Sequence, residues 1–176
     1  MTPPRISVAS WLSEFRRSMA AVTGTIVLVD QASKAAVRQL VSLHDSIDVI
    51  PGLLNLTHVR NTGAAFGILN ATDFAYKPAV MTAVAFVALV ALWAYAARRG
   101  WQGGAAGVGL ALILGGAFGN LIDRIAVGHV VDFVDVYWRT YHFWAFNVAD
   151  AAITAGAGCL LIDTLKTGRH DVSDTA

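Results

Sequence analysis

Two aspartates, Asp132 and Asp150, lie close together in a chain that otherwise keeps charge away from its long apolar stretches. Asp150 stands near the start of one such stretch. A carboxylate at membrane depth is costly, so it marks a functional site by default. Two close carboxylates cannot easily both ionise, so the pair holds one proton near neutral pH and titrates as a unit. One member can then activate water while the other protonates a leaving amine, which predicts a hydrolase.

Other hydrolytic chemistries lack their motifs in this sequence. There is no His-Glu-x-x-His, no Gly-x-Ser-x-Gly and no phosphate-binding Gly-Lys-Ser/Thr loop, and the five histidines are scattered. Ser33 beside Lys34 suggests a Ser/Lys dyad, but adjacent residues of a helix point in different directions. We therefore expect no metal and no organic cofactor, because water and two carboxylates suffice.

The composition indicates that a membrane protein positions these residues. Of 176 residues, 56% are hydrophobic and 14% are charged, whereas ordinary globular domains have roughly 45–50% and about 25%. The apolar residues are concentrated into blocks, and the length allows one membrane domain over residues 1–176 without a separate soluble domain. The formal net charge is +1, so nothing indicates a nucleic-acid partner.

Four stretches approach the roughly 20 apolar residues that a helix needs to cross a bilayer. The predicted spans are residues 19–40, 78–97, 105–122 and 146–165. The first follows Arg16 and Arg17 and so resembles a signal peptide, but Asp30 and Lys34 inside it argue against a cleaved one. We therefore expect an all-α integral membrane protein with four transmembrane helices.

Basic residues near the ends of the spans predict the orientation. They precede the first span, separate the second from the third and follow the fourth: Arg5, Arg16, Arg17, Arg98, Arg99, Lys166 and Arg169. Both termini should then be cytoplasmic, and loops 41–77 and 123–145 should face outward. In the first loop, Leu54–Arg60 roughly alternates apolar and polar residues, which predicts a small extracytoplasmic β element. The second loop is rich in aromatic residues, which predicts an interfacial loop lying on the bilayer.

Polar residues inside the predicted helices each have a structural explanation beside a functional one. Asp30 and Lys34 are four residues apart, so they share a helix face and can form an ion pair that helps insertion. Asn120, Asp123 and Arg124 also share a face, at the outer end of the third span. They predict a snorkelling helix end or, as we favour, a structural or binding network. Just before them, the spacing of Gly115 and Gly119 lets helices approach closely.

Two further amides lie near the predicted site. Asn61 and Gly63 belong to a turn signal, and by themselves they need be no more than a turn. Asn147 precedes Asp150 by three residues, where asparagine is a good N-terminal helix cap.

Two other classes of protein are compatible with the residues considered so far. A proton-coupled transporter or channel also uses acids in the membrane, but it would favour ionisable groups deep in the bundle and an internal repeat. Here the acids gather toward one interface and no repeat is visible. A non-catalytic assembly subunit would explain glycine-rich helix faces but not the paired aspartates. From the residues alone, all three classes remain open.

Taken together and in order, five motifs resemble those of the bacterial lipoprotein signal peptidases, the type II signal peptidases. The motifs are Asp30-x-x-Ser33-Lys34, Asn61-x-Gly63-x-Ala65-Phe66, Gly115-Gly116-x-x-Gly119-Asn120-x-x-Asp123-Arg124, Val131-Asp132-Phe133 and Phe146-Asn147-x-Ala149-Asp150. The resemblance covers nearly the whole chain outside the first eighteen residues and the short C-terminal tail.

This resemblance implies an aspartyl endopeptidase of the bacterial cytoplasmic (inner) membrane, with its active site near the outer face. Such enzymes remove the signal peptide from prolipoproteins just before a cysteine that carries a diacylglyceryl group. The implied partners are this substrate, membrane lipids and inhibitors of the globomycin type, and the enzyme is expected to be a monomer.

The resemblance also assigns roles by position. Asp132 and Asp150 become the catalytic pair, while Asp30 and Lys34 become structural residues. The positions implied to bind substrate or to support the aspartates are Asn61, Gly63, Asn120, Asp123, Arg124 and Asn147. The sequence departs from the family pattern at two places near the aspartates, neither of which changes a carboxylate. Phe143-Trp144 stands where family members often have Trp-Pro, and Ala151 stands where serine is common.

Overall fold

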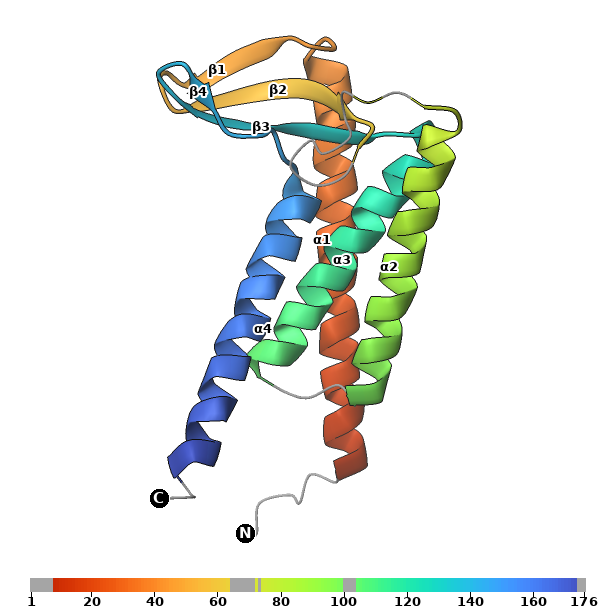
Figure 1. The fold of residues 1–176 in the computed structure, drawn as a ribbon, viewed down its shortest axis with the longest axis vertical. Helices are drawn as coiled ribbons and strands as arrows, with labels where there is room; N and C mark the ends of the chain where they lie inside the picture. The colour runs from red at the N-terminus through yellow and green to blue at the C-terminus, as the bar shows by residue number, and fades with distance from the viewer. Residues whose placement is uncertain (1–7, 64–71, 73, 100–103, 174–176) are drawn as a thin grey trace, which may run out of the picture.

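The computed structural model describes residues 8–63, 72, 74–99 and 104–173 (Figure 1). Some residues used in the sequence analysis lie outside this description, either entirely or in their side chains. They are Arg5, Ala65 and Phe66 entirely, and the side chains of Arg16, Arg98, Arg99 and Arg169.

The described residues form a bundle of four long helices with a small sheet at one end (Figure 1). The helices are α1 (Val8–Leu40), α2 (Lys77–Arg99), α3 (Ala105–Val127) and α4 (Val148–Ser173). α3 packs against each of the other three helices, most extensively against α4, and α1 also contacts α4. The bundle therefore brings the C-terminal ends of α1 and α3 and the N-terminal end of α4 together beneath the sheet (Figure 1).

Three of these helices, within the described residues, are long and apolar enough to cross a membrane. The segments are Lys77–Ala96, Ala105–Val127 and Val148–Lys166, with mean hydropathies of 2.2, 1.8 and 1.5. They coincide with the second, third and fourth predicted spans. The described part of α1, which carries Asp30, Lys34 and Arg38, is not among them. A fourth span therefore remains a prediction.

Glycines on α3 allow the close helix contacts that their spacing predicts. A Cβ atom on Gly115 would come within 2.8 Å of Ile26 Cβ on α1, and one on Gly116 would overlap the carbonyl oxygen of Ala149 on α4. A Cβ atom on Gly119 would meet the carboxylate of Asp30 at 2.5 Å. Small residues thus bring α1 and α4 against α3 at the level of the polar groups.

The sheet is antiparallel, with its described strands in the order β1-β2-β3-β4. The strands are β1 (Ser46–Ile50), β2 (Leu54–Asn61), β3 (Val130–Trp138) and β4 (Tyr141–His142). The predicted β element at Leu54–Arg60 is confirmed as most of β2. In the 123–145 segment the structure differs from the expected interfacial loop, because much of it is β3 and β4. The aromatic residues of the segment indicated a membrane interface, whereas the β-branched residues at the start of β3 favour the strand that pairs with β2.

A hydrophobic cluster fixes the sheet to the bundle. Val37 and Val41 at the end of α1 pack with Val131 and Phe133 of β3, and all four are buried. The turn into β3 is made at Gly128, whose φ of 77° ends α3 in a left-handed conformation that glycine adopts without strain. β3 therefore starts directly after the end of α3, and Asp132, between Val131 and Phe133, is held at the junction.

Candidate active site

The two aspartates reach one cavity from different elements. Asp132 is the third residue of β3, and Asp150 lies in the first turn of α4. Both line a cavity of about 890 Å³. Asp132 is only 2% exposed, so its carboxyl group is held at the boundary between the sheet and the helices.

Two asparagine side chains connect the aspartates. Asn147 Nδ2 donates to Asp132 Oδ1 at 2.6 Å, and Asn120 Nδ2 donates to Asp150 Oδ1 at 2.8 Å. Asn147 Nδ2 also lies 3.2 Å from Asn120 Oδ1, which joins the two amides. Each carboxylate is thus oriented by an amide that contacts the other amide.

Asn147 also caps α4, as its position before Asp150 predicts. Its Oδ1 accepts a hydrogen bond from the Asp150 backbone N–H at 3.0 Å, and its own N–H lies 3.4 Å from Asp150 Oδ2. This reciprocal arrangement resembles a capping box. The cap and the contact with Asp132 are therefore made by the same side chain.

The turn at the end of β2 supplies a second donor to Asp132. Asn61 Nδ2 donates to Asp132 Oδ2 at 3.0 Å, while Asn61 Oδ1 accepts from the Gly63 N–H at 3.0 Å. Arg124 Nη2 donates to the Gly63 carbonyl oxygen at 3.0 Å, and its Nη1 lies 3.4 Å from the Asn120 carbonyl oxygen. The predicted turn is real, and it orients an amide onto a carboxylate of the cavity.

Burial and a neighbouring charge make Asp132 an unusual carboxyl group. Removal from water, and then repulsion from Asp150, raise the pKa of Asp132 from 3.8 to about 7. Hydrogen bonds from Asn61 and Asn147 and the positive charge of Lys34 act in the opposite direction. Asp132 can therefore take up or release a proton near neutral pH, as a general acid or base must.

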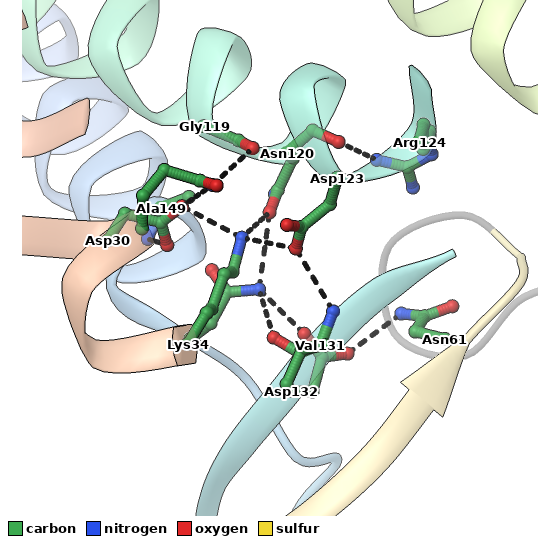
Figure 2. A network of polar contacts seen from close by, with 12 residues as sticks. Asp30, Lys34, Asn61, Gly119, Asn120, Asp123, Arg124, Val131, Asp132 and Ala149 are labelled. Carbon is green, nitrogen blue, oxygen red and sulfur yellow. Dashed lines mark hydrogen bonds and ion pairs between the residues drawn. The ribbon is translucent and has the colours of Figure 1, made fainter. Parts of the chain in front are cut away.

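A buried ion cluster around Lys34 lies close to Asp132, as Figure 2 shows. Lys34 Nζ is 2.8 Å from Asp30 Oδ2 and 3.0 Å from Asp123 Oδ2, and it donates to Asn120 Oδ1 at 2.9 Å. Arg38 Nη2 is 2.8 Å from Asp123 Oδ1. The ion pair expected between Asp30 and Lys34 is present, and it is part of a larger network.

Arg38 is the member of this cluster that the sequence analysis missed. It follows Lys34 by four residues and therefore lies on the same face of α1. This spacing indicates that the two side chains are neighbours. A lysine and an arginine so placed repel each other unless acids from another helix lie between them. Asp123 of α3 is such an acid.

The walls of the cavity are mainly apolar. They come from α2, α3, α4 and the segment before α4, and they include Met81, Leu92, Ile113, Ile153, Phe143, Trp144 and Phe146. The polar side chains of the lining are those of Asn61, Asn120, Arg124, Thr154 and the two aspartates. Within the ranges that the structure describes, no three His, Cys, Asp or Glu side chains come together as a metal site would require. The arrangement suits a largely apolar ligand with one polar, hydrolysable bond.

Comparisons with known proteins show which family the chain resembles in sequence and fold. The family model for signal peptidase (SPase) II matches residues 22–166. A lipoprotein signal peptidase of Geobacter metallireducens is 42% identical over 158 residues, covering 90% of this chain and 96% of the relative. One from Geobacter sulfurreducens is 44% identical over 156 residues, covering 89% and 96%.

Among solved structures, a bacterial membrane enzyme determined by the in meso method at 2.3 Å resolution superposes with a TM-score of 0.73 and 34% identity, covering 85% of this chain and 88% of that one. The chain belongs to the signal peptidase II family, membrane proteases that cleave signal peptides from prolipoproteins.

Proposed function

We propose that the protein is an aspartic endopeptidase that removes the signal peptide from diacylglyceryl-modified prolipoproteins, cutting before the lipidated cysteine. One observation carries the proposal: Asp132 and Asp150 line the same apolar cavity and are joined through Asn147 and Asn120. A lipid-anchored substrate is confined to the bilayer, so a site between the helix ends and the sheet suits it.

In the proposed mechanism, a water molecule lies between the two carboxyl groups. The ionised carboxylate takes a proton from this water as the water oxygen attacks the scissile carbonyl carbon. The protonated carboxyl gives its proton to the carbonyl oxygen, which forms a tetrahedral diol. The carboxyl that took the water proton then passes it to the leaving amine as the C–N bond breaks, and the diol returns a proton to the other carboxylate as the new carboxyl group forms. The raised pKa of Asp132, about 7, supports a pair that holds one proton at neutral pH.

The remaining polar groups take supporting roles in this proposal. Asn61, Asn120 and Asn147 orient the carboxylates, while Arg124 holds the Gly63 carbonyl oxygen and lines the cavity. The guanidinium is a rigid multiple donor, which suits a carbonyl oxygen of the substrate backbone. Asp123, Asp30 and Lys34 form the ion cluster behind the site.

The proposed setting is the bacterial inner membrane, crossed four times. Asp30 and Lys34, two of the charges in α1, are fully buried and paired, so they would not face lipid if α1 were the fourth span. Both termini would be cytoplasmic and the sheet would lie at the outer face. The enzyme would act as a monomer without cofactor or nucleic acid, and inhibitors of the globomycin type would occupy the cavity.

A cleavage assay with lipidated and unlipidated precursors tests this function. Purified protein in detergent is given a prolipoprotein with a diacylglyceryl cysteine and the same precursor with that cysteine changed to serine, which cannot be lipidated. We expect cleavage of the lipidated precursor with the modified cysteine as the new N-terminus, and little cleavage of the other. Equal cleavage of both precursors would contradict the lipid requirement, and cleavage of neither would contradict the peptidase.

A further inference from the structure

The ammonium group of Lys34 is fully buried and contacts two helices. Its partners are Asp30 on the same helix and Asp123 and Asn120 on α3, all within 3.0 Å. Figure 2 shows these contacts converging on the lysine nitrogen. An ion pair that only helped a helix to insert would need Asp30 alone, so the contacts with α3 require another explanation.

Both carboxylates of the cluster also bind the backbone directly before a catalytic aspartate. Asp30 Oδ1 accepts from the N–H of Ala149 at 3.0 Å, and Ala149 precedes Asp150. Asp123 Oδ2 accepts from the N–H of Val131 at 3.2 Å, and Val131 precedes Asp132. Through these acids, the lysine is connected to the start of α4 and to β3 at once.

Asn120 provides the connection from Lys34 to a catalytic side chain. Its Oδ1 accepts hydrogen bonds from Lys34 Nζ and Asn147 Nδ2, which leaves its Nδ2 to donate to Asp150 Oδ1. With the amide reversed, the Asn120 oxygen would face the Asp150 carboxylate and its NH₂ group would face the ammonium. Lys34 therefore fixes which end of the amide Asp150 meets.

We propose that Lys34 is a positioning residue for the aspartate pair, which sets the separation of the two carboxyl groups and orients the amide that supports ionised Asp150. The role rests on the proposed function of the pair. Lys34 is not among the residues that line the cavity, so it acts through Asp30, Asp123 and Asn120. Losing it should therefore alter proton transfer more than substrate affinity.

Several charges determine how the pair titrates, and they come from each element around it. α1 contributes Asp30 and Lys34, α3 contributes Arg124, and β3 and α4 contribute the aspartates themselves. Asp123 of α3 is ion-paired with both Lys34 and Arg38. Lys34→Met removes one positive charge and a donor from this set but keeps a side chain of similar length. A proton should then leave the pair less easily, and the acidic limb of the kcat/KM profile should move to higher pH.

The experiment compares purified Lys34→Met, Lys34→Arg and wild-type protein on the lipidated precursor across pH. For Lys34→Met we expect the acidic limb to move up by about one pH unit, kcat to fall about tenfold or more and KM to change little. Lys34→Arg keeps the charge and should return the limb toward its wild-type position. The control Lys77→Met removes another buried ammonium, one that donates to the Thr72 carbonyl oxygen, and it should keep the wild-type profile.

A folded Lys34→Met protein with the wild-type kcat and pH profile would overturn the inference, as would a Lys34→Arg profile displaced as far as that of Lys34→Met. If the uncompensated acids prevent folding, the Asp30→Asn/Lys34→Met protein, which loses an acid with the base, replaces it. Its acidic limb should move less, because Asp30 and Lys34 act on the pair with opposite charge, but kcat should still fall about tenfold or more; a wild-type kcat would overturn the inference. Wild-type protein that fails to cleave would count against the proposed function instead, so the two failures are distinguishable.

Discussion

At the residue scale, the proposed catalytic arrangement has a cost in stability. The pKa of Asp132 rises from 3.8 to about 7 on folding, so between these pH values the folded protein holds a proton that the unfolded chain releases. The contribution of this group to the free energy of unfolding is therefore greatest below the lower value and is lost as pH rises through the higher one. A buried acid next to another acid lowers stability, which is expected of a residue kept for the proposed activity.

This cost can be measured with Asp132→Asn, which cannot ionise. At pH 8 we expect its thermal unfolding midpoint in detergent to exceed that of the wild type by about 5 °C, because a buried charge is gone. At pH 4 the difference should nearly vanish, since the native carboxyl is then protonated. Asp48→Asn, on the exposed strand β1, should show no such pH dependence. A midpoint that Asp132→Asn leaves unchanged at both pH values would contradict the shifted pKa.

The donor from Asn61 acts on the same carboxyl group. Asn61→Ala removes a hydrogen bond that lowers the pKa of Asp132, so that pKa should rise further and kcat at neutral pH should fall about tenfold. Asn55→Ala is the matched control, because Asn55 lies in the same strand and donates to Asp135 instead. Cleavage assays across pH on both proteins make the comparison, and identical profiles for Asn61→Ala and the wild type would contradict the role of this turn.

At the element scale, the sequence predicted what depends on local spacing. The Asp30–Lys34 pair, the Asn147 cap and the strand at Leu54–Arg60 each follow from residues close in the chain. The contact between Lys34 and Asn120 joins residues 86 positions apart, and spacing along one sequence does not reveal such a pairing. Only the packing of α1 against α3 brings them together.

The pairing of β3 with β2 was missed for a related reason. Val59 lies opposite Asp132 across the two strands, in a register interrupted between Leu56 and Val59. A long-range register with an irregularity leaves no mark in either segment alone. The residue type and the family motifs therefore indicated Asp132 as a site residue. Its burial follows only from the folded structure.

The close contact of α3 with α4 gives a prediction at this scale. Gly116→Ala places a methyl group against the Ala149 carbonyl oxygen, one residue before Asp150. We expect a loss of about 1–3 kcal/mol in the free energy of unfolding, together with reduced cleavage, because α4 must move away. Gly158→Ala, on α4 with open space around it, should be neutral or slightly stabilising. Equal unfolding midpoints for the two variants would contradict this packing.

At the scale of the whole molecule, the proposed peptidase function depends on an apolar cavity that continues from the aspartates along α2 and α4. Its lining includes Ala88 and Leu92 of α2 and Ala155 of α4, several residues from the polar end. The second predicted span contains no charged residue that would distinguish one of its faces. Its sequence therefore does not indicate which face lines a cavity. The cavity arises from the arrangement of three helices.

Filling this cavity should exclude the substrate without touching the carboxylates. We expect Ala88→Trp to lower kcat/KM for the lipidated precursor about tenfold or more, mainly through KM, since a large ring occupies space that the substrate needs. Ala91→Trp, on the same helix but not in the cavity lining, should leave kcat/KM near the wild-type value. Titrating substrate against both proteins separates KM from kcat, and equal KM values would contradict the binding role of the cavity.

The most direct test of the central claim, that two aspartates share the chemistry, uses Asp132→Asn and Asp150→Asn. Each variant keeps the shape of the side chain and removes its ionisable proton. With the lipidated precursor in detergent, we expect both folded variants to lose cleavage by at least about a thousandfold, while Asp48→Asn cleaves as the wild type does. Cleavage that survives in either folded aspartate variant would contradict the two-aspartate mechanism.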